Sequence, residues 1–210
     1  YIHFDSPDKR GIDVALLYRP TFRLLTAYPI PIPLSEDETT RDILYASGTY
    51  RYTDTLHLFL CHLPSQSGGT AATAWKREAA VAVLQQHIDS IFSLSPKAQI
   101  VVMGDMNTAP EENIRGLHNA MLRLPKHSDS TQGTHKYKGR WSFLDQFYLS
   151  DSLLYITDVQ VYSAPYLLED DLRYLDTKPR RTYIGYRYQA GYSDHLPIRL
   201  TIKYKTDCQK

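Results

Sequence analysis

The run Gly104-Asp105-Met106-Asn107 carries the residue types that phosphate chemistry uses. It follows residues 100–103, a continuous apolar run typical of a strand buried on both faces. Gly104 lets the backbone turn without a side-chain clash, so Asp105 and Asn107 can point into one small volume. There a carboxylate could hold a metal or orient a water, and an amide could bind a phosphoryl oxygen without repelling it. The alternative is a loop in which Asp and Asn are ordinary turn formers.

A second cluster, Ser193-Asp194-His195-Leu196-Pro197, stands just before the last expected strand. Adjacent Asp and His side chains could bind a metal with one group and a substrate oxygen with the other. The alternative is a solvated loop, and the motif alone does not separate the two interpretations.

Two further residues of interest stand in apolar strands. His62 ends the run 56–61, where a lone histidine is more often structural than catalytic. Asp145 lies within the apolar run 143–149, where a buried carboxylate is costly unless it is paired. A histidine is the expected type of partner, because the pairing fixes the tautomer and orientation of the imidazole ring.

The elements that must position these residues are mostly strands, expected at residues 12–18, 22–28, 43–52, 56–61, 100–103, 143–149, 157–162 and 196–204. Apolar residues at helical spacing predict a helix over 71–92, and its expected buried face is Trp75, Val81, Leu84, Ile88 and Ile91. One long helix between two buried strands favours an α/β domain with mixed sheets. No repeat or internal boundary divides residues 1–210, so we expect a single domain.

The remaining segments are expected to be less regular. A short helix is expected over 114–122 and an exposed polar loop over 125–139. Residues 164–192 are charged and rich in tyrosine, and a connection of that length inside a compact domain is usually functional or mobile.

Composition narrows the functional class. The formal net charge is only +1, which argues against tracking of a long phosphate backbone but leaves room for a local basic patch or a small phosphorylated substrate. The two cysteines, Cys61 and Cys208, give neither a disulfide framework nor a zinc site. No apolar stretch reaches the length of a membrane span. The chain begins with Tyr1, so a targeting signal cannot be read, and both a cytoplasmic and a secreted or periplasmic location stay open.

The four signals in this order resemble the later motifs of the endonuclease/exonuclease/phosphatase superfamily. That deoxyribonuclease I-like group also includes apurinic endonucleases, inositol polyphosphate phosphatases and bacterial sphingomyelinases. Asp194-His195-Leu196-Pro197 is similar to its C-terminal signature, and Asp105-Met106-Asn107 is similar to its central one. Residues 5–15 resemble a bacterial subgroup. The resemblance covers nearly the whole chain and implies a four-layer α/β sandwich of two mixed sheets flanked by helices.

The resemblance also implies a role for each matching residue. Asp105 would orient or activate the attacking water, and Asn107 would stabilise the pentacovalent transition state. His62 would contact the phosphoryl oxygens, and His195 would act as general base or as a donor to the phosphate. Asp145 would hold His195 through a hydrogen bond. Asp194, together with Asp105, would help to bind Mg²⁺, with Mn²⁺ as an alternative, a hard cation that suits carboxylates, phosphate and water.

The chain departs from the superfamily pattern at its start. Two earlier motifs of the superfamily, an Asn on the first strand and a metal-binding Glu, have no counterpart here. We therefore expect an N-terminally truncated domain that lacks its first strand or strands. Uncovered strand edges would then invite self-association.

The expected activity is metal-dependent hydrolysis of a phosphodiester or phosphomonoester by in-line attack of water, and a nuclease and a small-molecule phosphatase are both consistent with it. Cations of the segment Lys178-Pro179-Arg180-Arg181 are the candidates for contacting the phosphates of the ester or nucleic-acid substrate. Tyr183, Tyr186 and Tyr188 could stack on bases or simply pack. The alternatives are a non-catalytic binding domain that retains the fold, and an inactive fragment of the enzyme.

Overall fold

The computed structural model describes residues 1–210 except 36, 51–53, 112, 125–132, 155–156 and 204–210. Its centre is a six-stranded mixed sheet with the strand order β3-β4-β5-β6-β10-β7. Only the pair β5–β6 is parallel within this sheet. The strands span, in that order, Phe22–Ile30, Ile43–Tyr50, Leu56–His62, Gln99–Asp105, Asp145–Ser150 and Leu117–Asn119.

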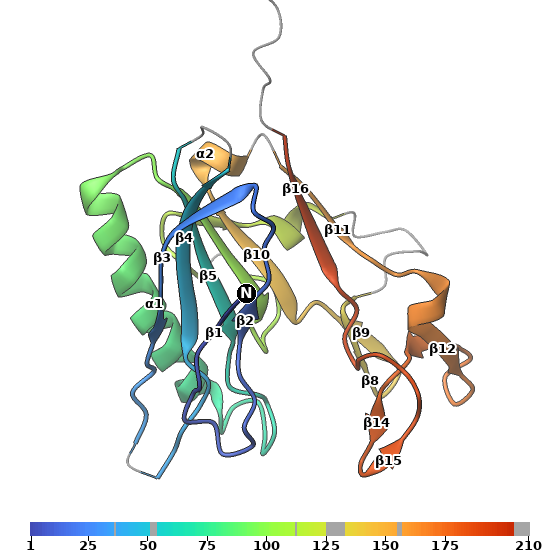
Figure 1. Cartoon of the computed structure of the whole chain (residues 1–210). Helices are drawn as coiled ribbons and strands as arrows, with labels where there is room; N and C mark the ends of the chain where they lie inside the picture. Colours follow the sequence, from blue (N-terminus) through green and yellow to red (C-terminus); the bar gives the residue numbers. More distant parts are fainter. Residues whose placement is uncertain (36, 51–53, 112, 125–132, 155–156, 204–210) are drawn as a thin grey trace, which may run out of the picture.

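One face of the sheet is covered by the long helix α1, Ala74–Leu94 (Figure 1). Leu84 and Ile88 of this helix are buried against sheet residues such as Phe59. The expected apolar face was wrong at Trp75, which is 42% exposed. Arg77 takes a buried place on the helix instead, because its guanidinium donates hydrogen bonds to the carbonyl oxygens of the loop that follows β5.

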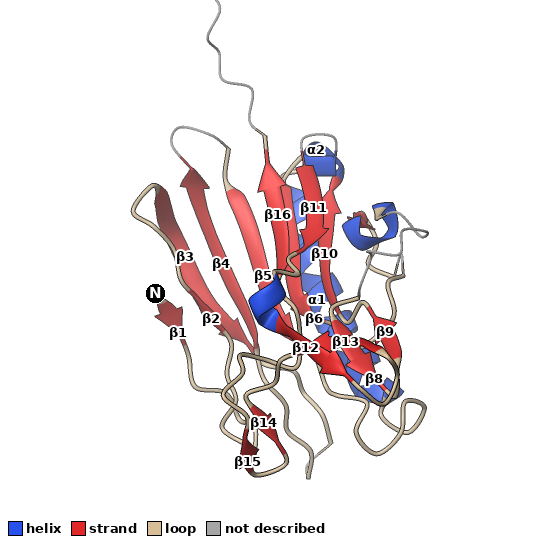
Figure 2. Cartoon of the chain, turned by 90° about the vertical axis from the view of Figure 1, so that its right-hand side faces the viewer, coloured by secondary structure: helices blue, strands red, loops and turns tan. Residues whose placement is uncertain are grey.

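The other face of the sheet is covered by strand pairs (Figure 2). β11, Thr157–Val161, pairs with β16, Ile198–Ile202, and β1, Ile2–His3, pairs with β2, Ala15–Leu16. Apolar side chains of β11 and β16 pack on the buried side chains of β5, β6 and β10. The fold class is therefore confirmed as mixed α/β with a central mixed sheet, and it is compatible with the four-layer sandwich.

A smaller lobe lies beside the lower end of the sheet in Figure 1. It is built from short elements, namely β8 (His135–Tyr137), β9 (Arg140–Ser142), η2 (Pro165–Leu167), β12 (Leu168–Asp171), β13 (Asp176–Pro179), β14 (Tyr183–Ile184) and β15 (Arg187–Tyr188). Buried Lys136 ties β8 to the β12–β13 hairpin, since its Nζ lies 2.7 Å from Asp176 and 3.4 Å from Asp171. The connection expected over 164–192 is thus largely structured.

The helix expected over 114–122 was wrong. This stretch forms β7 and then the 3-10 helix η1, Ala120–Arg123, and a further short helix, α2, spans Asp151–Leu154. Ile114, Leu117 and Met121 are all buried, which imitates helical spacing, but Asn119 ends the strand by accepting a hydrogen bond from the Met121 amide.

Other predicted element boundaries also differ from those in the structure. The strand expected over 12–18 is only Ala15–Leu16. Parts of three expected segments lie outside the described residues, namely 51–52, 125–132 and 204. Cys208 also lies outside them. Among helices in the described part of the chain, none has both the length and the apolarity needed to cross a membrane.

Candidate active site

The register of three neighbouring strands brings His62, Asp105 and Asp145 together. His62 is the parallel partner of Asp105, and Asp105 is the antiparallel partner of Asp145. Because side chains two residues apart share a face of a strand, all three project on the same face as Leu60, the face that the strand pairs cover. His62 Nε2 lies 3.7 Å from Asp105 Oδ2.

A tight turn after β6 fixes the direction of Asp105. Gly104 has a φ of +130°, and a Cβ there would overlap the carbonyl oxygen of Cys61, so only glycine lets β6 approach β5 this closely. Asn107 has a φ of +50°, and its backbone amide donates to Asp105 Oδ1 at 2.8 Å. Its side-chain Nδ2 donates to Asp105 Oδ2 and to the carbonyl oxygen of Leu63, both at 3.0 Å. The backbone amide and the side-chain amide of Asn107 therefore both hold the turn.

The expected hydrogen bond between Asp145 and His195 is present, with 2.6 Å between Asp145 Oδ2 and His195 Nδ1. Thr134 positions both partners. Its Oγ1 accepts hydrogen bonds from the amides of Leu144 and Asp145, and its carbonyl oxygen accepts one from the amide of Leu196. The segment before β16 is thereby fixed against the start of β10.

Two overlapping groups of possible metal ligands meet at His195. The ligand atoms of Asp105, Asp145 and His195 lie within 4.8 Å of one another, and so do those of His135, Asp194 and His195. The two expected metal ligands, Asp105 and Asp194, thus belong to different groups. The sequence interpretation missed His135, whose ring centroid lies 4.7 Å from that of His195. Its only sequence signal is the polar stretch around it, which gives no indication of a site.

Burial and neighbouring charges shift the titration of the site. Burial, and then the charge of Asp145, raise the pKa of Asp105 to about 6. Burial, and then the charge of Arg41, lower the pKa of His62 to about 4. Burial alone would lower the pKa of His195, but the hydrogen bond and charge of Asp145 outweigh it and raise this pKa. His62 is thus neutral at neutral pH, while two carboxylates face each other beside it.

A buried arginine that the sequence interpretation also missed holds the backbone of the site in place. Arg41 donates to the carbonyl oxygens of His62 (3.0 Å) and Leu63 (2.9 Å) and pairs with Asp8 Oδ1 at 2.9 Å. Leu63 O also accepts the Asn107 hydrogen bond, so one guanidinium links the segment between β1 and β2 to both turns of the site.

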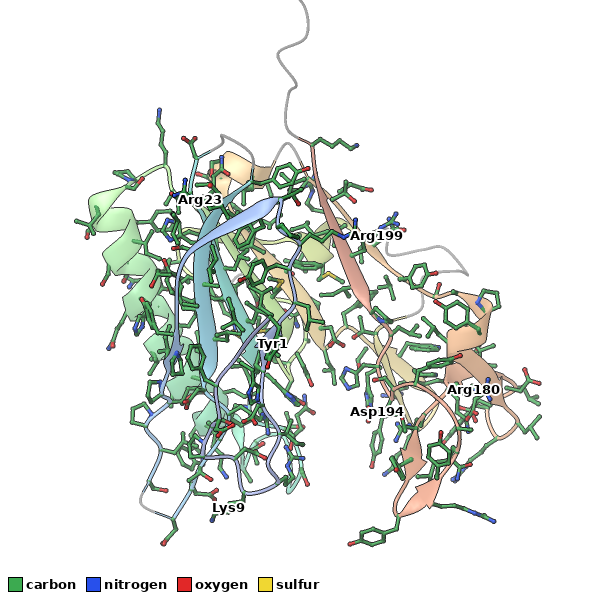
Figure 3. All side chains as sticks on the ribbon, in the orientation of Figure 1. Tyr1, Lys9, Arg23, Arg180, Asp194 and Arg199 are labelled. Atoms are coloured by element: carbon green, nitrogen blue, oxygen red, sulfur yellow. The ribbon has the colours of Figure 1, made fainter. Side chains whose placement is uncertain are left out.

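The three expected substrate-binding cations lie in the lobe rather than in the sheet. Lys178 faces Glu169 across the β12–β13 hairpin, with 3.5 Å between charged atoms. Arg180 lies on the same lobe as Asp194 (Figure 3). The charge of Arg181 contributes to lowering the pKa of His135, after burial and the charge of His195. The charge of Arg181 therefore acts on the site through His135.

Comparison with known proteins agrees with this geometry. The model of the endonuclease/exonuclease/phosphatase family matches residues 1–204. The chain belongs to this family. Membership supports a metal-dependent phosphoesterase kind of function and leaves the substrate undetermined. The comparison with curated proteins gave no match.

Several solved structures have a similar fold. Truncated TDP2 from Caenorhabditis elegans is 17% identical with a TM-score of 0.60, over 88% of this chain and 68% of that one. The catalytic domain of human Nocturnin with bound sulfate is 18% identical with a TM-score of 0.50, over 86% and 60%. D. rerio TDP2 complexed with a single strand DNA product is 19% identical with a TM-score of 0.50, over 84% and 66%. At such identities the likeness establishes the fold alone.

Proposed function

We propose that the chain hydrolyses the P–O bond of a phosphate ester by attack of water, assisted by a divalent cation. The observation that carries this proposal is the convergence of His62, Asp105 and Asp145 at the ends of three adjacent strands, with His195 held opposite them. A binding module has no need of two opposed carboxylates between two histidines. Family membership supports the same kind of reaction.

Asp105 and its neighbour Asn107 would direct the attacking water. The carboxylate of Asp105 is held by two hydrogen bonds from Asn107, so its orientation is set before any substrate arrives. In this state Asn107 is a positioning residue. It would contact a phosphoryl oxygen, as the family resemblance implies, only by giving up one of its two side-chain hydrogen bonds.

The two histidines would serve the phosphoryl group and the proton transfers. Asp145 accepts the Nδ1 hydrogen of His195, which leaves Nε2 of that ring available to donate or accept a proton. His62 is neutral at neutral pH and offers an N–H donor for a phosphoryl oxygen without adding charge.

The donor set fits a hard divalent cation. Asp105 and Asp145 are direct cross-strand partners, and like charges in that relation destabilise a sheet unless something neutralises them. The proposed carboxylate ligands for Mg²⁺ or Mn²⁺ are Asp105, in the group with Asp145 and His195, and Asp194, in the adjoining group with His135 and His195, with water and substrate oxygens completing the coordination. When bound, the cation would neutralise phosphate charge during the displacement.

Substrate binding would use the cations of the lobe. Arg181, whose charge acts on His135, is the proposed contact nearest the reacting phosphate. Arg180 would contact a more distant phosphate. Lys178 is offset by Glu169 and would contribute least.

Hydrolysis of bis-p-nitrophenyl phosphate and p-nitrophenyl phosphate, each with Mg²⁺, Mn²⁺ or EDTA, tests the proposal and separates diester from monoester preference. Asp105→Ala and His195→Ala should each lower the rate by about 10²–10⁴-fold. Asp89→Ala, which removes an exposed ion pair on α1, is the matched control and should keep the wild-type rate. Metal-independent turnover, or turnover that survives both site substitutions, would refute the mechanism. Absence of turnover in every condition would favour a binding domain.

A further inference from the structure

The β14–β15 hairpin presents an aromatic face to solvent. Tyr183 pairs with Tyr188 and Ile184 with Arg187 across a two-residue ribbon, so the two tyrosines share one side of it. Their ring centroids are 5.5 Å apart. Both remain accessible, with Tyr183 57% and Tyr188 64% exposed, and fully exposed Tyr186 stands at the turn between them. Although these two rings contact each other, more than half of each side chain is exposed and available to a ligand.

The hairpin is fixed in place beside the candidate active site. Tyr192 donates its amide hydrogen to the Arg180 carbonyl at 2.7 Å, and the Thr182 hydroxyl donates to the Tyr192 carbonyl at 2.6 Å. Gly191 closes the base of the hairpin, because a Cβ there would overlap the carbonyl oxygen of Arg180. Asp194 and His195 follow directly in the chain. The hydrogen bonds at the base of the hairpin therefore fix the position of the aromatic face relative to these two site residues.

Positive charge accompanies the aromatic face. Residues 177–193 contain four cations and no carboxylate, although the whole chain has a net charge of only +1. Lys178 is offset by Glu169, whereas Arg180, Arg181 and Arg187 form no ion pair within the described residues. Figure 1 shows the hairpin at the lower end of the molecule, the end toward which β5 runs, and β6 runs parallel to β5. The aromatic face therefore belongs to a positively charged segment that leads directly along the chain to Asp194 and His195.

We propose that the β14–β15 hairpin binds the unpaired bases of a single-stranded nucleic acid and thereby positions its phosphodiester backbone at the candidate active site. This proposal rests on the proposed phosphoester hydrolysis. Aromatic rings stack on any base, since every base has a π face, and arginines follow the backbone. A duplex hides its bases in the stack and offers nothing to Tyr183 and Tyr188. Cations without a carboxylate among them favour a polyanion as the ligand.

Binding can be measured without turnover. The probe is a fluorescently labelled oligothymidylate of about 12 nucleotides, read by anisotropy in EDTA, against a duplex of the same length. Tyr183→Ala and Tyr188→Ala should each weaken binding about fivefold or more, and Tyr183→Phe should restore it, because stacking needs the ring and not the hydroxyl. Arg187→Gln should reduce the slope of log affinity against log salt by about 0.7. Tyr28→Ala on β3, far from the hairpin, is the matched control.

The outcomes separate this proposal from the proposed function. Equal affinity of wild type and both tyrosine variants, or tighter binding of the duplex, would overturn the hairpin proposal. So would a self-associated wild type that becomes monomeric in Tyr188→Ala, because the face would then be a protein interface. If the wild type hydrolyses bis-p-nitrophenyl phosphate but does not bind the oligonucleotide, only the hairpin proposal is refuted. If it binds the oligonucleotide but hydrolyses nothing, only the proposed reaction is refuted.

Discussion

Replacing Asp145 with Asn separates the charge of this side chain from its shape. In the wild type its carboxylate lies 2.6 Å from His195 Nδ1, and the two side chains are 18% and 21% exposed. A hydrogen bond to a charged group contributes about 1.5–3 kcal/mol and a neutral one about 0.5–1.5 kcal/mol, so the substitution weakens this contact by about 1 kcal/mol. It also removes the repulsion between Asp145 and its cross-strand partner Asp105, which offsets part of that loss.

We therefore expect Asp145→Asn to stay within about 1 kcal/mol of the wild-type free energy of unfolding. Hydrolysis of bis-p-nitrophenyl phosphate should nevertheless slow by about 10²–10⁴-fold, because an amide neither stabilises the imidazolium form of His195 nor selects its tautomer. Urea denaturation and steady-state kinetics on the same preparation measure the two effects. Asp158→Asn, at an exposed position of β11, is the control and should match the wild type in both.

Two results would contradict this reasoning. A variant with the wild-type rate would show that the pair takes no part in the reaction. A loss of stability beyond about 3 kcal/mol would show that Asp145 is required for folding, so that its kinetics could not be assigned to chemistry.

Three other predictions concern the scaffold. Burial alone would raise the pKa of Asp8, but hydrogen bonds from the backbone of Arg10 and the side chain of Arg41 lower it, so its charge stabilises the fold above about pH 4 and this contribution is lost as the pH falls. Asp8→Asn should thus be less stable than wild type at about pH 7 and equal to it near pH 2 in urea titrations. Gly104→Ala should lose more than about 1 kcal/mol and its activity, whereas Gly68→Ala, with positive φ in open space, should lose less. The outer edges of β2 and β16 are unpaired within the described residues, so light scattering should show a mass that rises with concentration; a constant monomer mass would refute this.

The strands of the sheet could be predicted because buried strands leave a strong pattern. Residues 100–103 are a continuous apolar run and residues 56–61 are apolar except for His57, and the structure places both in the centre of the sheet. The helix expected over 114–122 failed because a short buried segment with apolar residues three and four apart satisfies helical spacing without being a helix. Only the pairing of Leu117–Asn119 with β10 decides its conformation.

The candidate site could be predicted where its residues form local motifs, and it could not be predicted where residues act through tertiary contacts. Asp105, Asn107 and His195 stand in short polar runs at strand ends, so their positions mark them. Arg41 and Thr134 stand in no such run. Their roles come from carbonyl and amide groups that approach them from other strands, and single-sequence spacing carries no record of such contacts.

The opposed pair Asp105 and Asp145 is better explained by function than by folding. Neighbouring strands gain stability from complementary cross-strand pairs and lose it from like charges, and burial makes the loss larger. The sheet keeps the pair at a point where Asn107 also adopts positive φ, so two features that do not favour stability coincide at one strand end. Such features persist where the surrounding structure holds them in place and a reaction needs the geometry. The buried side chains of β5, β6 and β10 supply that support, while the segment carrying His195 brings the fourth group from the opposite layer.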